Sequence, residues 1–251
     1  MFKLVAVHSF RGGTGKSNVT ANLATLLAWT GKQVGVVDTD LQSPGIHIPF
    51  GLDQADMTYS LNSFLWGECT IEDAVYDVTP EVVRQRNGSV RLAPGSFKTE
   101  EITRIVSEGY DITQLSEGLN TIADRLNLDY VFIDTHPGVN NETLLAMALA
   151  DALVMILRPD GQDFEGTAVT VEVAQHLGIP KLLLVVNKVL EALDVNSIRS
   201  LVEKTYDAPV AGVLPMAQEM MLLGSRDLFC LKYPKHPLTQ ELIAIARQVV
   251  A

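Results

Sequence analysis

The chain has 251 residues, 47% of them hydrophobic and 20% charged, which is typical of a globular enzyme and excludes a disordered protein. Its formal net charge of −11 repels nucleic acid and anionic lipid on average. No apolar run reaches the roughly 18 residues of a membrane span, and the N-terminus does not read as a secretory signal. Cys69 and Cys230 form no metal or redox motif, so we expect reduced thiols in a cytoplasmic protein.

Short apolar runs alternate with segments of helical periodicity, which is typical of parallel β-α-β units. In the first half of the chain we expect the strand Lys3–His8, a helix from Val19 to a C-cap at Gly31, the strands Gln33–Asp38 and Val90–Ala93, and a helix capped by Asp111. The strand Tyr130–Asp134, the helix Asn141–Ala150, the strand Ala152–Leu157 and the helix Phe164–Leu177 follow. The last expected elements are the strand Lys181–Asn187, the helix Val195–Thr205, the strand Pro209–Leu214 and the helix Leu238–Val250. Most of these strands are apolar throughout, as in a sheet covered on both faces. The sequence therefore predicts an α/β fold, a mostly parallel central sheet with helices on both faces, in a single domain over residues 1–251. Boundaries between 41 and 107 are left open.

A glycine-rich loop joins the first predicted strand to the first predicted helix, the setting that a Walker A phosphate loop requires. Its sequence is Phe10-Arg11-Gly12-Gly13-Thr14-Gly15-Lys16-Ser17. The glycines let successive backbone N–H groups face an anion, and the helix start adds the positive end of its dipole. We expect Lys16 to reach the β- and γ-phosphates of ATP and the Ser17 hydroxyl to bind Mg²⁺. The predicted nucleotide-binding residues in and beside this loop are Arg11, Gly12, Gly13, Thr14, Gly15, Lys16, Ser17 and Asn18.

This loop resembles the deviant Walker A motif of the MinD/ParA family, K-G-G-x-G-K-[ST], with Arg11 in place of the family's first, signature lysine. Further blocks follow in the family's order: Val36–Asp40 resembles its strand ending in D-x-D, Tyr130–Gly138 its Walker B strand and second switch, and Val185–Lys188 and Gly212–Pro215 its adenine-binding segments. The shared order implies a MinD/ParA-like P-loop NTPase.

The resemblance also implies roles for individual residues. Asp40 would orient or activate the attacking water, and with Lys16 and Arg11 it makes up the catalytic set. Ser17, Asp38, Asp40 and Asp134 would form the metal site, and Asn187, Lys188 and Pro215 would meet the adenine. An aspartate at a strand end often merely caps a turn. Beside a phosphate loop, however, the ends of neighbouring parallel strands converge on one crevice, which favours the metal site.

Arg11 carries the prediction of a dimer. In the MinD/ParA family the signature lysine contacts the nucleotide of the other subunit, so the resemblance implies an ATP-dependent homodimer. An arginine retains the positive charge and offers a bidentate fork for phosphate oxygens, so it would act in trans as an arginine finger does. The alternatives are a local ion pair with Asp38 or Asp40, or a solvated surface arginine.

The implied function is a slow, partner-stimulated ATPase that positions or partitions a cargo through an unidentified stimulating or cargo protein. One alternative is an ATP-gated protein-binding regulator with negligible turnover. Another is a DNA-binding partition ATPase of the ParA type, which the net charge of −11 disfavours. Its candidate DNA contacts are Arg84, Arg86, Arg91, Lys98, Arg104, Lys232, Lys235 and Arg247.

The last predicted helix bears on membrane binding. Its apolar stripe consists of Leu238, Leu242, Ile245 and Val249, and Arg247 is its only cation. An interfacial helix normally carries several cations on its polar face, so we expect this stripe to pack against the domain and no direct membrane anchor. The Met216–Leu223 segment, with several large apolar residues, is either a partner site or core packing, and packing is favoured.

Overall fold

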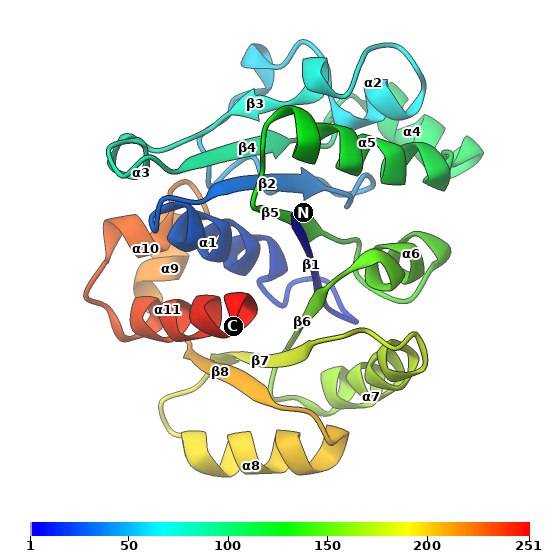
Figure 1. Cartoon of the computed structure of the whole chain (residues 1–251). Helices are drawn as coiled ribbons and strands as arrows, with labels where there is room; N and C mark the ends of the chain where they lie inside the picture. The colour runs from blue at the N-terminus through cyan, green and yellow to red at the C-terminus, as the bar shows by residue number, and fades with distance from the viewer. Residues whose placement is uncertain (1) are drawn as a thin grey trace.

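The computed structural model describes residues 2–251 and contains an eight-stranded sheet (Figure 1). Its strand order is β3-β4-β2-β5-β1-β6-β7-β8, and all neighbours are parallel except β3 and β4. The strands are β1 Lys3–His8, β2 Gln33–Asp38, β3 Tyr76–Asp77, β4 Ser89–Ala93, β5 Tyr130–Asp134, β6 Ala152–Leu157, β7 Leu182–Val189 and β8 Val210–Pro215. This confirms the predicted fold class and, within two residues at each end, every predicted strand. The two-residue edge strand β3 was missed because it is too short to show any periodicity.

Helices cover both faces of the sheet (Figure 1). They are α1 Lys16–Ala28, α2 Leu61–Leu65, α3 Glu81–Arg84, α4 Thr99–Glu108, α5 Ile112–Arg125, α6 Asn141–Leu149, α7 Gly161–His176, α8 Val195–Tyr206, α9 Gln218–Leu223, α10 Phe229–Lys232 and α11 Pro237–Val250, with short 3-10 turns at Gln54–Asp56 and Glu72–Ala74. Helices α1, α10 and α11 pack on one face, and α2, α4, α5, α6, α7 and α8 on the other. Within residues 2–251, no helix combines the length and apolar character needed to cross a bilayer.

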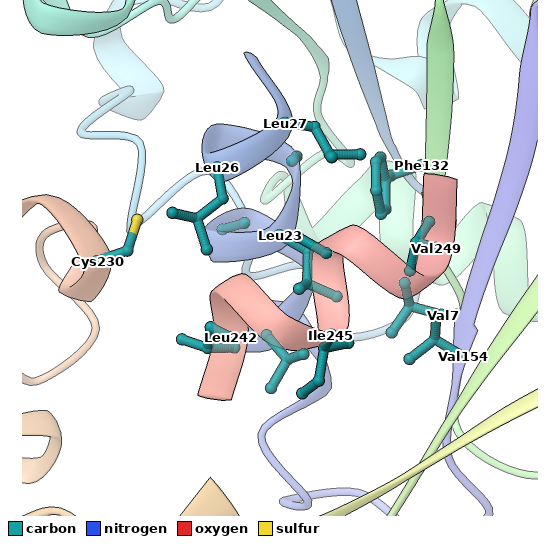
Figure 2. Packing of buried hydrophobic residues seen from close by; sticks show 14 of the residues in the cluster. Val7, Leu23, Leu26, Leu27, Phe132, Val154, Cys230, Leu242, Ile245 and Val249 are labelled. Carbon is teal, nitrogen blue, oxygen red and sulfur yellow. The ribbon is translucent and has the colours of Figure 1, made fainter. Parts of the chain in front are cut away.

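The C-terminal helix α11 is a core element. Figure 2 shows Leu242, Ile245 and Val249 directed at α1 and the sheet, near Leu23 and Phe132. All four residues of the predicted apolar stripe are at most 4% exposed. Gly212 of β8 permits this approach, because a Cβ there would lie 2.6 Å from Ile245 Cδ1. The expectation that the stripe packs against the domain is confirmed.

The start of α7 differs from the sequence expectation, and the glycine inside α5 has a structural reason. Helix α7 begins at Gly161, three residues earlier than predicted, because the Asp160 side chain accepts a hydrogen bond from Asp163 N and caps it. Gly118 lies inside α5, where glycine is unfavourable by about 1 kcal/mol relative to alanine. A Cβ at that position would lie 2.6 Å from Phe64 Cε1, so close packing of α5 on α2 requires the glycine.

Candidate functional site

The glycine-rich loop joins β1 to α1 at the carboxyl ends of the parallel strands. Gly13 and Gly15 have φ values of 76° and 94°, a region that glycine adopts without strain. Gly15 precedes α1 and no side chain caps the helix start. A Cβ added to Gly13 would meet nothing within 4 Å, so this side of the loop is open. Uncapped N–H groups at an open helix start form an anion-binding cradle.

Lys16, the first residue of α1, lies among three aspartates. Its Nζ is 2.8 Å from Asp134 Oδ1 and 3.9 Å from Asp40 Oδ2, and the lysine side chain is only 7% exposed. Asp38 and Asp134 end the adjacent strands β2 and β5 as register partners, and both are fully buried. The fold therefore brings together Lys16 and the three predicted aspartates.

Within the described part of the chain, the three aspartates of this cluster face a single cation, Lys16, so their negative charge is only partly neutralised. Asp38 accepts hydrogen bonds of 3.1 Å from the backbone N–H groups of Asp40 and Gly45. Even so, burial and then repulsion from Asp134 raise the pKa of Asp38 to about 8. Asp134 Oδ2 is buried without a hydrogen-bond partner among the described residues. Both observations indicate a place prepared for additional positive charge.

The donor set fits Mg²⁺ only in company with phosphate. Over residues 2–251, no group of three or more His, Cys, Asp or Glu side chains is arranged to hold a metal ion. Mg²⁺, however, retains several waters and is commonly bound through one or two carboxylates and substrate phosphates. The Ser17 hydroxyl, in the first turn of α1, and the unpartnered Asp134 Oδ2 suit that mode.

A cavity of about 380 Å³ opens beside the loop, a size within the usual range for small-molecule pockets. Asn187 Nδ2 donates to Thr14 O and Lys188 Nζ to Gly13 O, each at 2.7 Å, so the end of β7 fixes the phosphate loop. Asn18 Oδ1 is buried without a partner among the described residues. The lining includes Gly15, Asn18, Asn187, Lys188, Pro215, Met216, Ala217, Met220 and Leu242. The predicted base-binding residues thus lie around one cavity that adjoins the loop.

Arg11 points away from the carboxylate cluster and towards the start of α7. It donates to Gln162 Oε1, and its Nη1 lies 3.9 Å from Asp160 and 3.8 Å from Asp163. The predicted alternative of an ion pair with Asp38 or Asp40 was wrong in its partners, because the acidic start of α7 is the nearer negative charge. The side chain remains 40% exposed.

Sequence reasoning missed one residue of the site. His136 Nδ1 lies 2.7 Å from Asp40 Oδ1, although the two residues are far apart in the chain. The available signal was its position in the segment Asp134–Gly138, which resembles a switch. The segment Met216–Leu223 divides: Met220 and Leu223 pack on the core, whereas Met221 and Leu222 are 63% and 85% exposed. The predicted packing therefore holds for only part of it.

Known proteins resemble this chain in sequence and in fold. Residues 2–193 match the model of a protein family described as an AAA domain. An uncharacterised ATP-binding protein of Methanocaldococcus jannaschii is 28% identical over 98% of this chain and 87% of its own length. An iron-sulfur cluster carrier protein of Methanococcus maripaludis is 30% identical over 73% of this chain and 59% of its own. The septum site-determining protein MinD of Pyrococcus horikoshii, solved with Mg-ADP, superposes with a TM-score of 0.81 and 23% identity, over 99% of this chain and 96% of that one.

Proposed function

Because this chain belongs to the AAA-domain family of MinD/ParA-type P-loop ATPases, we propose that it is a cytoplasmic, Mg²⁺-dependent ATPase that switches between monomer and homodimer. Residues 1–251 act as one ATPase domain in this proposal. Turnover is slow and is stimulated by a partner protein, through which the switch positions or partitions a cargo. The observation that carries the proposal is Lys16, held among Asp134, Asp40 and Asp38 beside an open glycine cradle.

The phosphate site works through exchange of partners. The N–H groups from Gly12 to Ser17 bind phosphate oxygens, and Lys16 turns from Asp134 to the β- and γ-phosphates. When bound, Mg²⁺ neutralises charge on the phosphate oxygens. Ser17, Asp38, Asp40 and Asp134 would hold that cation, and it would supply the positive charge that the aspartate cluster lacks. Asp40 orients the attacking water, since phosphoryl transfer depends mainly on positioning and on electrostatic stabilisation.

The remaining predicted residues serve the base and the dimer. Asn18, Asn187, Lys188 and Pro215 line the adjoining cavity and hold the nucleoside end there. Arg11 leaves its partners at the start of α7 and contacts the nucleotide of the second subunit. Arg11 is partly exposed and contacts only the start of α7 in these interactions, which supports this role because a side chain at the surface can reach a second subunit.

Two experiments test the proposal together. Calorimetry of ATP into the full chain, with and without Mg²⁺, should show binding that the metal strengthens. Size-exclusion chromatography with ATP, ADP and a non-hydrolysable analogue should show a dimer with the triphosphates alone. Absence of any heat with magnesium nucleotide would falsify the whole proposal, and a nucleotide-independent monomer would remove the switch.

The main alternative is an ATP-gated regulator with negligible turnover. It shares the nucleotide site and differs only in the chemistry at Asp40. A measurable phosphate-release rate in the wild type that falls strongly in Asp40→Ala favours the enzyme. Binding and dimerisation without measurable release in the wild type favour the regulator.

DNA binding is a weaker alternative for this chain. Among its candidate contacts, Arg84 and Arg91 pair with Asp77, Lys98 pairs with Glu101, Arg104 pairs with Glu68 and Glu108, and Lys232 pairs with Asp227. Cations that already face carboxylates offer less to a phosphate backbone. Adding duplex DNA to the chromatography at two salt concentrations tests this, because DNA binding of this kind weakens steeply with salt.

The iron-sulfur relative suggests a cluster carrier, and the cysteines argue against that. Burial, followed by repulsion from neighbouring carboxylates, raises the pKa of the Cys69 thiol to about 11. Burial raises the pKa of Cys230, whose side chain is fully enclosed, to about 12. A cluster is held by cysteine thiolates, and the burial of both cysteines opposes thiolate formation there.

A further inference from the structure

An imidazole lies against the carboxylate that the proposed function assigns to the attacking water. His136 Nδ1 and Asp40 Oδ1 are 2.7 Å apart, and the two side chains are 23% and 11% exposed. An ionised carboxylate only accepts hydrogen bonds, so Nδ1 carries the proton and donates it. The imidazole forms no other hydrogen bond within residues 2–251. The contact with Asp40 is therefore what orients the ring.

Three contacts connect Asp40 to the other residues of the site. Its backbone N–H donates to Asp38 Oδ1 at 3.1 Å, its Oδ1 accepts from His136, and its Oδ2 faces Lys16 Nζ at 3.9 Å. The contact with Lys16 is the longest, and the proposed function removes it when the ammonium turns to the phosphates. His136 is then the side chain that still fixes the plane of the carboxylate, and Oδ2 is the oxygen left to accept from water.

The backbone around His136 connects this contact to the segment that resembles the second switch. His136 lies between Asp134, which ends β5, and Gly138, whose φ is 86°. Gly138 N donates to Ser9 O at 3.1 Å, next to the phosphate loop. A shift of this segment would carry the imidazole away from Asp40. The hydrogen bond between His136 and Asp40 thus links the conformation of this segment to the orientation of the Asp40 carboxylate.

We propose that His136 is a positioning residue for ATP hydrolysis, which fixes Asp40 through Nδ1 so that Oδ2 faces the attacking water. This inference rests on the proposed function and adds a residue to it. Misplacing a reacting group by about 1 Å can lower a rate on the order of 100-fold. Asp40 retains its backbone anchor without His136, so a smaller loss, on the order of 10-fold in kcat, is expected for His136→Ala.

The test uses four variants of the full chain at saturating Mg-ATP: His136→Ala, His136→Asn, Asp40→Ala and the double variant of Asp40→Ala with His136→Ala. The alanine variant should lose kcat while its ATP affinity changes by less than about twofold, the mark of an interaction made in the transition state. Asparagine retains a donor near the position of Nδ1 and should restore most of the rate. The double variant should be no slower than Asp40→Ala, because residues that act as a unit are not additive.

A second readout does not depend on activity. Nitrogen NMR of the histidine side chains should show His136 in the Nδ1–H tautomer, and Asp40→Ala should abolish that preference. His176→Ala is the matched control, because His176 is an exposed residue of α7 whose ring forms a hydrogen bond with a backbone oxygen of its own helix. It should leave kcat and the His136 signal unchanged.

The outcomes separate the two proposals. If the wild type hydrolyses ATP and His136→Ala is equally fast, the positioning role is wrong and the proposed function stands. Additive losses in the double variant, or an asparagine variant as slow as alanine, overturn the role as well. If the wild type binds ATP without turnover, the proposed hydrolysis fails and the positioning role fails with it.

Discussion

The ammonium of Lys16 lies 2.8 Å from Oδ1 of Asp134, in a buried pair that connects the start of α1 to the end of β5. Thr20 Oγ1 donates to the same carboxylate oxygen at 3.2 Å. The other oxygen of Asp134 has no partner among the described residues, and Asp38 lies opposite on β2. The side chain of Lys16 thus stabilises the aspartate cluster and is also the proposed phosphate ligand.

Lys16→Ala should therefore affect stability as well as binding. Removing one partner of a buried pair leaves an uncompensated charge, which costs about 3 kcal/mol or more. Urea unfolding of the variant should show that loss, and calorimetry should show no ATP binding. Lys32→Ala is the control. Lys32 pairs with Asp129 at 3.4 Å, and its side chain is 46% exposed. Exposed ion pairs contribute less than about 1 kcal/mol to stability. Equal stability of the two variants would contradict the argument.

Gly15→Ala tests the geometry of the cradle. The position has a φ of 94°, and a Cβ would lie 2.5 Å from Asn187 Nδ2, the donor that holds Thr14 O. Left-handed backbone is unfavourable for alanine by about 1–2 kcal/mol, and the clash also displaces Asn187. ATP affinity should fall at least tenfold, about 1.4 kcal/mol. Gly45→Ala is the control, because a Cβ there meets nothing within 4 Å. A Gly15→Ala variant with wild-type affinity would show that the loop does not bind phosphate in this conformation.

The parts of the fold and of the site that depend on local sequence could be predicted, whereas contacts between residues far apart in the chain could not. The phosphate loop and the buried strands were predicted because their signals are local: glycines and Lys16 between a strand and a helix, and unbroken apolar runs. The pair of His136 with Asp40 and the contact of Arg11 with Gln162 join residues 96 and 151 positions apart. Side-chain partners at such separations follow from the packing of α7 and β5 against the loop, which no local pattern specifies.

Arg11→Ala addresses the dimer. The guanidinium contacts Gln162, Asp160 and Asp163 at the surface, and the proposed function moves it to the nucleotide of the second subunit. The variant should bind ATP as a monomer with nearly wild-type affinity and should not dimerise with ATP. Light scattering after size-exclusion chromatography measures this directly. Gln162→Ala, which removes the hydrogen-bond partner of Arg11 at α7, should leave ATP-dependent dimerisation intact. An undiminished dimer of Arg11→Ala would remove the trans role.

The final prediction concerns acid stability and His8, which is fully buried at the end of β1. Its Nδ1 is 2.6 Å from Thr135 Oγ1, and its Nε2 has no partner among the described residues. Burial first, and then the charges of Lys16 and His136, lower the pKa of His8 from 6.5 to about 3. The unfolded chain therefore takes up a proton near pH 6.5, whereas the folded chain does so only near pH 3, and stability falls as the pH drops through that window.

The size of this effect at His8 is measurable. Between pH 7 and pH 5 the difference between the two pKa values of His8 lowers the unfolding free energy by about 2 kcal/mol. His8→Asn retains a polar atom near Thr135 but does not titrate, so it should lose about 2 kcal/mol less than the wild type over that interval. Urea unfolding at the two pH values measures the difference. His176→Ala, which replaces an exposed histidine, should behave like the wild type. If His8→Asn shows the same pH dependence as the wild type, then His8 is protonated in the folded state and the buried neutral imidazole is wrong.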